Sequence, residues 1–212
     1  MDRLSLHISD GNVFSSKGRL DPWMWTWRQT ETPEDAVPAS AEQALALVAA
    51  SGNMRRIPVG VIGPRDASES QLATAEAIGA AVGRLGLTMI CGGRGGVMEA
   101  ASKGCMHSGG LTVGLLPDHE WHSANDFIAL PIATGLSEAR NMIIAKSCAV
   151  LIAVGGSYGT LSEIAYGLHF SKLVIGLDGA HEIEGLVVAQ SAHEAMVRLA
   201  EHFMGSLVLS DN

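Results

Sequence analysis

From Ile57 onward, short apolar runs alternate with longer segments of helical periodicity. The apolar runs are nearly continuous in Val, Ile, Leu and Ala, which is typical of strands covered on both faces, as in a parallel sheet. They predict strands at residues 57–63, 87–91, 111–117, 127–132, 149–156, 172–177 and 186–190. The periodic segments predict helices at residues 69–86, 97–110, 137–147 and 160–170, and a last helix capped by Ser191. We therefore expect an α/β fold with a doubly wound, mainly parallel sheet, that is, a Rossmann-like domain.

The N-terminal segment has a different pattern. Residues 4–8 alternate between apolar and polar, the pair Asp10-Gly11 follows, and then residues 13–20, so we expect a small β-hairpin. A polar, proline-bearing stretch then predicts a linker that ends at residue 38. The expected organisation is a hairpin and linker over residues 1–38 and the Rossmann-like domain over residues 39–212, opened by a helix that Ser40 caps.

Three tryptophans, Trp23, Trp25 and Trp27, lie within five residues of this segment. They could form an aromatic platform for a flat ligand, or an alternating strand that buries one face. We favour the strand, because buried aromatic rings contribute large apolar area to packing.

The composition of the chain excludes some classes of function. The formal net charge of −8 and the lack of any Lys/Arg cluster argue against binding to nucleic acid, which needs a basic surface. The odd number of cysteines, 3, in apolar surroundings indicates reduced thiols and a cytoplasmic protein. No apolar run approaches the length of a membrane span, and the first residues lack the apolar core of a signal peptide. A small anionic ligand remains possible, since backbone amides can hold it.

Glycine, with 25 copies, gathers where predicted strands end. In a sheet of this kind, ligands bind beyond the carboxyl ends of the strands. Glycine lets a phosphate approach backbone amides, and the following helix offers unpaired N–H groups. Neither the dinucleotide fingerprint G-x-G-x-x-G nor a Walker loop is present. The turns still predict a phosphate-bearing ligand, held by Gly63, by Gly92, Gly93, Arg94, Gly95 and Gly96, and by Gly155, Gly156, Ser157, Tyr158, Gly159 and Thr160.

Two charged residues follow these turns. Glu163 stands three residues after Thr160, in the spacing of a capping box, and lies off the apolar stripe expected for its helix. It therefore serves either the helix start or the chemistry of the adjoining site. Arg140 is expected in the first turn of a helix capped by Ser137, where a cation opposes the helix dipole. Solvent exposure would explain that position, and pairing with an anionic ligand or with Glu163 would explain it better.

Three segments resemble the signatures of the Lonely Guy (LOG) superfamily: residues 92–98, residues 138–141 and residues 156–163. The enzymes of that family are phosphoribohydrolases, which cleave nucleoside 5′-monophosphates into free base and ribose 5-phosphate. The resemblance implies that Arg140 and Glu163 are catalytic and that residues 156–160 hold the phosphate. It covers the chain from Ile57 to the C-terminus, and the N-terminal segment lies outside it.

Two departures point to a sister branch. The enzymes have Pro-Gly-Gly where this chain has Gly155-Gly156-Ser157, and they usually have lysine after the arginine, where this chain has Asn141. We therefore count Asn141 among the ligand-binding residues. The differences look more like the branch with the molybdenum cofactor carriers, which bind a pterin phosphate and are not defined by hydrolysis. The expectation is a hydrolase or a carrier that requires no cofactor, with molybdenum cofactor as a possible ligand, and a homodimer or larger homo-oligomer like its relatives.

Other reactive residues are not assigned a function. His119 and His122 lack a third ligand for zinc, so we expect no metal site. Cys91, which ends a predicted strand, is interpreted as a buried core thiol and not as a nucleophile. Tyr158 can either stack on a base or pack on its own loop.

Overall fold

The protein is described here from a computed structural model, which describes residues 5–205; residues 1–4 and 206–212, which belong to the expected hairpin segment and C-terminal end, lie outside the described part. The strands are β1 (Leu6–Ser9), β2 (Asn12–Ser15), β3 (Gly18–Asp21), β4 (Thr26–Arg28), β5 (Val37–Ala39), β6 (Pro58–Ile62), β7 (Thr88–Cys91), β8 (Leu111–Leu116), β9 (Leu130–Ala133), β10 (Val150–Val154), β11 (Leu173–Leu177) and β12 (Val187–Val188). The helices are α1 (Ala41–Ala50), α2 (Glu69–Arg84), α3 (Val97–His107), α4 (Arg140–Ser147), α5 (Tyr158–His169) and α6 (Ala192–Gly205), with short 3-10 helices η1 (Trp121–Ser123) and η2 (Ser137–Ala139).

These elements form two compact units. One contains residues 57–195, and the other combines residues 1–56 with residues 196–212. The division thus falls after Arg56, whereas the sequence led us to expect a boundary after residue 38. The reason is that α1 packs against β1 and β2 and so belongs with the N-terminal strands. The end of α6 also belongs to this unit, where Phe203 lies 5.5 Å from Trp25 between ring centroids.

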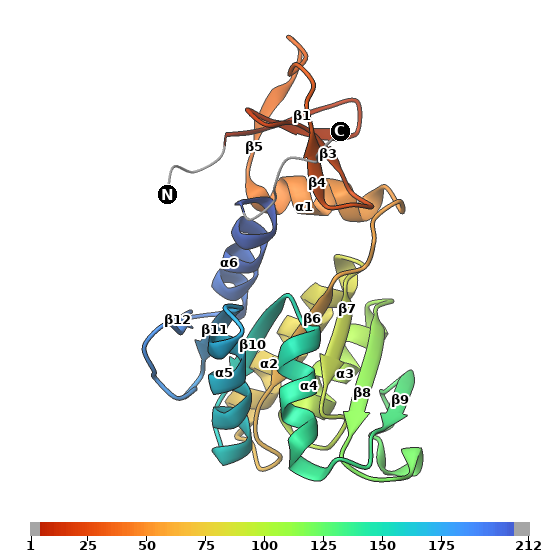
Figure 1. The fold of residues 1–212 in the computed structure, drawn as a ribbon, viewed down its shortest axis with the longest axis vertical. Coiled ribbons are helices and arrows are strands. Elements are labelled where there is room, and N and C mark those ends of the chain that lie inside the picture. The colour runs from red at the N-terminus through yellow and green to blue at the C-terminus, as the bar shows by residue number, and fades with distance from the viewer. Residues whose placement is uncertain (1–4, 206–212) are drawn as a thin grey trace. The chain divides into compact units, whose positions relative to one another are not determined.

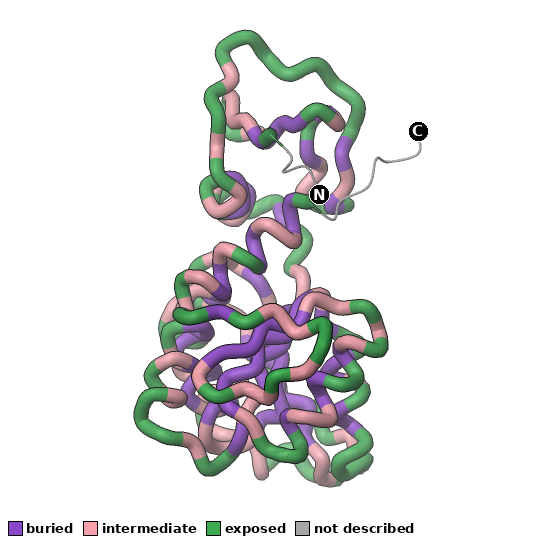
Figure 2. The backbone as a smooth tube through the Cα atoms, turned by 90° about the vertical axis from the view of Figure 1, so that its left-hand side faces the viewer, coloured by how far each residue is buried: buried purple, intermediate pink, exposed green. Residues whose placement is uncertain are grey.

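The larger unit is the expected doubly wound domain. Its sheet has the strand order β12-β11-β10-β6-β7-β8-β9, and all the pairs are parallel. Helices α2 and α3 pack together on one face, and α4 and α5 pack together on the other (Figure 1). The strands run through the buried centre of the unit (Figure 2). The predicted fold class is therefore confirmed.

A buried cluster between the sheet and the α4–α5 layer holds the candidate site in place. It contains Ile62, Ile90, Val113, Leu115, Ile144, Ala145, Cys148, Leu151, Ala153, Ile164 and Val174. Every member is apolar, so its burial supplies the hydrophobic free energy that fixes α4 and α5 on the strands. The two helices that carry Arg140 and Glu163 are therefore set by the core and not by the charged residues.

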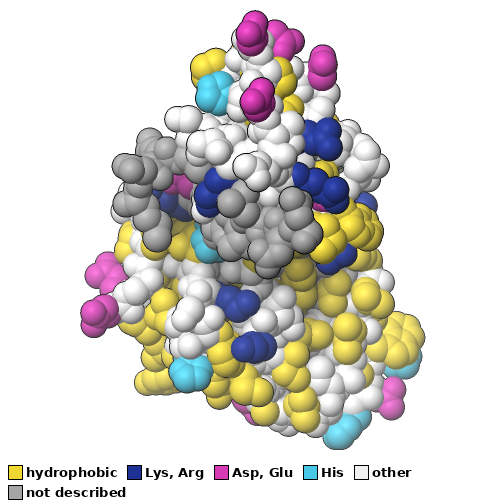
Figure 3. Space-filling view, turned by 45° about the horizontal axis from the view of Figure 1, so that its top comes forward, with side chains coloured by type: hydrophobic (Ala, Val, Ile, Leu, Met, Phe, Trp, Pro, Cys, Tyr) yellow, Lys and Arg dark blue, Asp and Glu magenta, His cyan; other side chains and the backbone are white. Residues whose placement is uncertain are grey.

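The smaller unit is an antiparallel sheet with the strand order β4-β3-β2-β1-β5. The expected hairpin is present as β1 and β2, and its turn places Asp10 at φ 45° and Gly11 at φ 73°, the left-handed conformation that such a pair favours. The segment between β4 and β5 exposes Glu31, Glu34 and Asp35. Figure 3 shows acidic side chains grouped at the tip of this unit. Such a cluster of carboxylates makes this tip of the unit locally negative.

The expectation of a continuous tryptophan strand is wrong. Trp23 and Trp25 lie in a turn, because the Asp21 carboxylate accepts hydrogen bonds from the amides of Trp23 and Met24, and the Trp25 amide bonds to the Asp21 carbonyl. Only Trp27 belongs to a strand, β4. Trp25 and Trp27 are buried, whereas Trp23 is 56% exposed and lies under the Arg55 guanidinium, at 5.0 Å.

Candidate functional site

The strand order reverses at β6, the strand between β10 and β7. A ligand site is expected at such a reversal, beyond the carboxyl ends of the strands. The turn after β6 meets the end of β10 there: a Cβ atom on Gly63 would lie 2.5 Å from the carbonyl oxygen of Val154. The turn after β7 joins them, because the Val97 amide donates to the Pro64 carbonyl at 3.1 Å. The structure therefore brings the predicted glycine turns together.

Gly96 is the tightest point of this junction. It has φ +70°, and a Cβ atom there would lie 2.1 Å from the Arg65 carbonyl oxygen. Only glycine fits both the conformation and the space. A Cβ atom on the neighbouring Gly95 would fit without a clash, because its nearest neighbour would be the Glu99 carboxylate, at 3.5 Å. The two adjacent glycines thus have different roles: Gly96 joins β6 to α3, and Gly95 faces open space.

The turn after β10 leads into α5. Gly155 has φ +65°, and its amide donates to the Leu177 carbonyl at 3.0 Å. Helix α5 begins at Tyr158, and Ser157 is its N-cap, with Oγ accepting from the Thr160 amide at 3.4 Å. The first-turn amides of Tyr158 and Gly159 have no carbonyl to bond within the helix, so they can hold an anion. We call the turn and first helical residues, Gly155–Thr160, the cradle.

The expected capping box is wrong. Because the N-cap is Ser157 and not Thr160, Glu163 lies in the second turn of α5 and cannot bond to the amide at the helix start. The expected position of Glu163 off the buried face of the helix is wrong as well, since Glu163 is buried. The Glu163 side chain is 7% exposed, with Oε1 3.5 Å from Nη1 of Arg140. The structure thus excludes the helix-start role and pairs Glu163 with Arg140.

Arg140 begins α4, directly after the 3-10 helix η2. We expected Ser137 to be the N-cap of this helix. It is instead the first residue of η2, with φ 48°. The Arg140 side chain is 10% exposed, and its guanidinium lies against Gly92, where a Cβ atom would be 2.6 Å from Nη2. A buried cation in the first turn of a helix is unfavourable alone, and the carboxylate of Glu163 offsets it. Nε of Arg140 is buried without a hydrogen-bond partner in the described part of the chain.

Asn141 orients this pair. Its Oδ1 accepts a hydrogen bond from Nη1 of Arg140, and its Nδ2 donates to Oγ of Ser162 at 2.9 Å and to the Gly159 carbonyl at 3.4 Å. These bonds tie α4 to the start of α5. Both ends of the Asn141 side-chain amide are therefore bonded within the protein, whereas the sequence suggested direct ligand contact.

Burial sets the electrostatics. Desolvation raises the pKa of Glu163 to about 7, although Arg140 lowers it, and desolvation lowers the pKa of Arg140, although Glu163 raises it. Arg65 and Arg94 also lower the pKa of Arg140, so three guanidinium groups share this region. Near neutral pH, the carboxyl group of Glu163 is therefore divided between its protonated and ionised forms.

A hollow of about 360 Å³ adjoins the turns after β6 and β7. Its lining residues are Arg65, Arg94, Gly95, Glu99, Ser123, Ala124, Asn125 and Asp126. Arg94 forms an ion pair with Asp118 and donates to the Ser123 carbonyl at 3.2 Å. Sequence reasoning had not selected Arg65, Ser123 or Asn125. Arg65 could have been found from its place two residues after Gly63, whereas the segment after β8 has no local signal.

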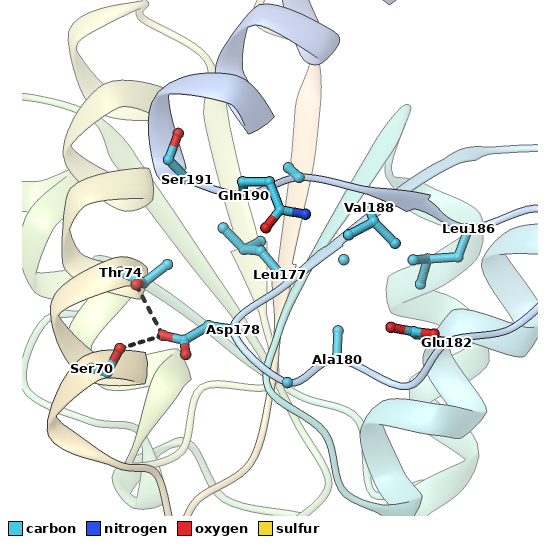
Figure 4. Close-up of a pocket in the computed structure, with 13 residues that line it drawn as sticks. Ser70, Thr74, Leu177, Asp178, Ala180, Glu182, Leu186, Val188, Gln190 and Ser191 are labelled. Carbon is cyan, nitrogen blue, oxygen red and sulfur yellow. Dashed lines mark hydrogen bonds between the residues drawn. The ribbon is translucent and has the colours of Figure 1, made fainter.

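A larger hollow, of about 450 Å³, lies at the end of β11 (Figure 4). It is lined by Ser70, Thr74, Gly176, Leu177, Asp178, Gly179, Ala180, Glu182, Leu186, Val188, Ala189, Gln190 and Ser191. None of the residues predicted to form the site lines this hollow. We therefore do not assign it to the predicted site, although it is the larger of the two hollows.

The remaining predicted residues are distributed as follows. Tyr158 is 91% exposed and does not pack on its loop. Cys91 is buried, and burial raises the pKa of its thiol, which disfavours the nucleophilic thiolate. Within residues 5–205, no group of His, Cys, Asp and Glu side chains could hold a metal ion. Over the same residues, no helix has the length and apolar character needed to span a bilayer.

Comparison with protein families gives a match to one family model. Residues 56–204 match the model described as "SLOG cluster4 family". A protein of Archaeoglobus fulgidus, described only as uncharacterized, is 42% identical over 143 residues, which are 68% of this chain and 94% of that protein.

Two similar solved structures belong to molybdenum cofactor proteins. The molybdenum cofactor binding protein of Rippkaea orientalis is 34% identical with a TM-score of 0.65, over 69% of this chain and 96% of that one. The carrier protein of Chlamydomonas reinhardtii is 33% identical with a TM-score of 0.65, over 72% of this chain and 100% of that one. The family match begins at residue 56, so the N-terminal strands and α1 lie outside it.

Proposed function

The chain belongs to the SLOG cluster4 family, and we propose that it binds a phosphorylated, nucleotide-like ligand across the carboxyl ends of β6, β7 and β10. One observation carries the proposal: the glycine turns after these strands meet beside the first-turn amides of α5 and the buried pair Arg140–Glu163. The phosphate group binds to the cradle. The rest of the ligand extends over Gly92 toward the hollow between Arg65 and Arg94.

We further propose that the protein is a carrier and that its cargo is molybdenum cofactor or a related pterin phosphate. The two cofactor-binding relatives support this assignment. The donor set fits the cargo's organic part: backbone amides suit the phosphate, and the guanidinium groups of Arg65 and Arg94 suit the hydrogen-bonding edge of a pterin. We propose that this carrier acts as a homodimer or larger homo-oligomer in the cytoplasm.

Hydrolysis of a nucleoside 5′-monophosphate is the second candidate. It is favoured by Glu163, because cleavage of an N-glycosidic bond builds positive charge on the ribose, which a carboxylate stabilises while it positions water. A pKa of about 7 suits proton transfer near neutral pH. Arg140 would then orient Glu163 and the ligand. Against hydrolysis, the side chain of Glu163 is 7% exposed and paired, which leaves little room for an attacking water.

Incubation of the purified protein with nucleoside 5′-monophosphates separates the two functions. We expect calorimetry to detect binding of adenosine 5′-monophosphate, and chromatography to detect no free adenine. The Glu163→Gln variant keeps the side-chain shape and removes the charge, so it serves as the control. Release of base by the wild type, abolished in that variant, would establish the hydrolase and reject the carrier. Absence of binding to any phosphorylated ligand would reject both.

A further inference from the structure

A histidine outside the predicted site lies directly on the cradle. His181 belongs to the segment that follows β11, and its ring packs against Gly156. A Cβ atom on Gly156 would be 2.7 Å from Cδ2 and 2.8 Å from Nε2 of His181. The second glycine of the cradle is therefore required by this imidazole, independently of any ligand.

The imidazole has an unused hydrogen-bonding atom. Nε2 of His181 is buried, and no hydrogen-bond partner lies near it within the described residues. Shielding a polar atom from water without a partner costs free energy, which a native protein usually recovers by bonding the atom. Here the protein supplies no partner, so the geometry leaves this nitrogen available to a ligand on the same turn.

The segment that carries His181 is firmly attached at its start. Oδ2 of Asp178 accepts hydrogen bonds from Ser70 at 2.9 Å and Thr74 at 3.1 Å, as Figure 4 shows. The carbonyl of Asp178 accepts another from Nε2 of Gln71, at 3.0 Å. The side chain of Gln71 also lies against Gly155, 2.4 Å from the position of an added Cβ. Helix α2 thus anchors the start of this segment at Asp178 and lies against the first residue of the cradle.

The cradle itself lacks cationic side chains. Residues 155–160 contain neither Lys, Arg nor His. A phosphate monoester carries between one and two negative charges near neutral pH. Backbone amides and the helix dipole supply only partial positive charge. An imidazole can donate from Nε2 in its neutral form and in its charged form, so His181 suits this position.

We propose that His181 is a ligand-positioning residue, whose Nε2 donates a hydrogen bond to an oxygen of the phosphate group bound at Gly156–Thr160. The inference rests on the proposed function, since it requires a phosphate in the cradle. The donor atom already lies beside Gly156, within the turn that would hold that oxygen. Neither the resemblance nor the comparisons assign a role to this residue.

Two substitutions separate hydrogen bonding from packing. His181→Phe keeps a flat ring against Gly156 and removes the donor, and His181→Gln keeps a donor and removes the ring. We expect calorimetry with adenosine 5′-monophosphate to show affinity at least tenfold weaker in His181→Phe, because a hydrogen bond to a charged group is lost, and within threefold of wild type in His181→Gln. Thermal unfolding of both variants checks that each is folded.

The outcomes distinguish the inference from the proposed function. A wild-type affinity in His181→Phe, or a loss in His181→Gln alone, means that the ring only packs on Gly156 and overturns the inference while ligand binding stands. If the wild type itself binds neither adenosine 5′-monophosphate nor inorganic phosphate, the proposed function fails and the inference fails with it.

Discussion

Replacement of Arg140 by methionine is expected to lower the free energy of unfolding by about 3 kcal/mol or more at pH 8.5, because it leaves the carboxylate of Glu163 buried without its partner. Methionine keeps the length of the aliphatic part and removes the charge. The same variant is expected to lose binding of phosphorylated ligands, since Arg140 borders the path from the cradle to Gly92. Urea unfolding measures the first effect and calorimetry the second.

The destabilisation caused by Arg140→Met should depend on pH. The pKa of Glu163 is already raised to about 7 by burial, and removal of Arg140 takes away the group that lowers it, so it rises further. In the unfolded chain the same group ionises near its ordinary value of 4.5. A carboxyl group with a raised pKa in the folded state makes stability fall as pH rises from the unfolded to the folded pKa. That fall ends near pH 7 in the wild type and continues above it in the variant.

The difference between variant and wild type is therefore expected to widen between pH 7 and pH 9. Arg65→Met is the matched control, because it replaces the same type of side chain at an exposed position, in the turn after β6. We expect it to alter the unfolding free energy by less than about 0.5 kcal/mol. An Arg140→Met protein as stable as wild type at every pH would show that the buried ion pair is not what holds Glu163.

Gly96→Ala is expected to lower the unfolding free energy by about 3 kcal/mol, since it combines a left-handed backbone with overpacking. The added methyl group would lie 2.1 Å from the Arg65 carbonyl oxygen and 2.5 Å from that of Pro64. Neither oxygen can move without displacing the turn after β6. The variant should therefore also bind phosphorylated ligands more weakly, because that turn forms one wall of the site.

The adjacent substitution, Gly95→Ala, is the control for Gly96→Ala. Its methyl group would only touch the end of the Glu99 side chain, at 3.5 Å. We expect a change in unfolding free energy below about 0.5 kcal/mol. Thermal and urea unfolding of the two variants side by side make the comparison. Equal stability of the two would contradict the tight junction between β6 and α3.

The helices and strands could be predicted from local sequence patterns, because they depend on interactions between residues close in the sequence. Continuous apolar runs predicted the parallel strands, and the helix caps at Ser40 and Ser191 depend on hydrogen bonds to residues only three positions away. The convergence of the glycine turns followed from the general rule for doubly wound sheets. These features needed no knowledge of which residues meet in space.

The errors concern residues whose surroundings come from distant parts of the chain. Glu163 has the spacing of a capping box, but Ser157 is the N-cap of its helix. The carboxylate of Glu163 pairs instead with Arg140, which lies on another helix. The tryptophan segment alternates like a strand, but the Asp21 carboxylate folds it into a turn. Only tertiary structure brings His181 beside Gly156 and Asn125 into the hollow near Arg94, and no local pattern marks either residue.

The most direct test of the central claim is a titration of the ¹⁵N-labelled protein with adenosine 5′-monophosphate, followed by two-dimensional NMR, with adenosine as the ligand that lacks phosphate. The account predicts that the largest shifts fall on the amides of Gly156, Ser157, Tyr158 and Gly159, and that adenosine alone leaves them in place. Unchanged cradle amides, or shifts confined to the hollow beside Asp178, would contradict it.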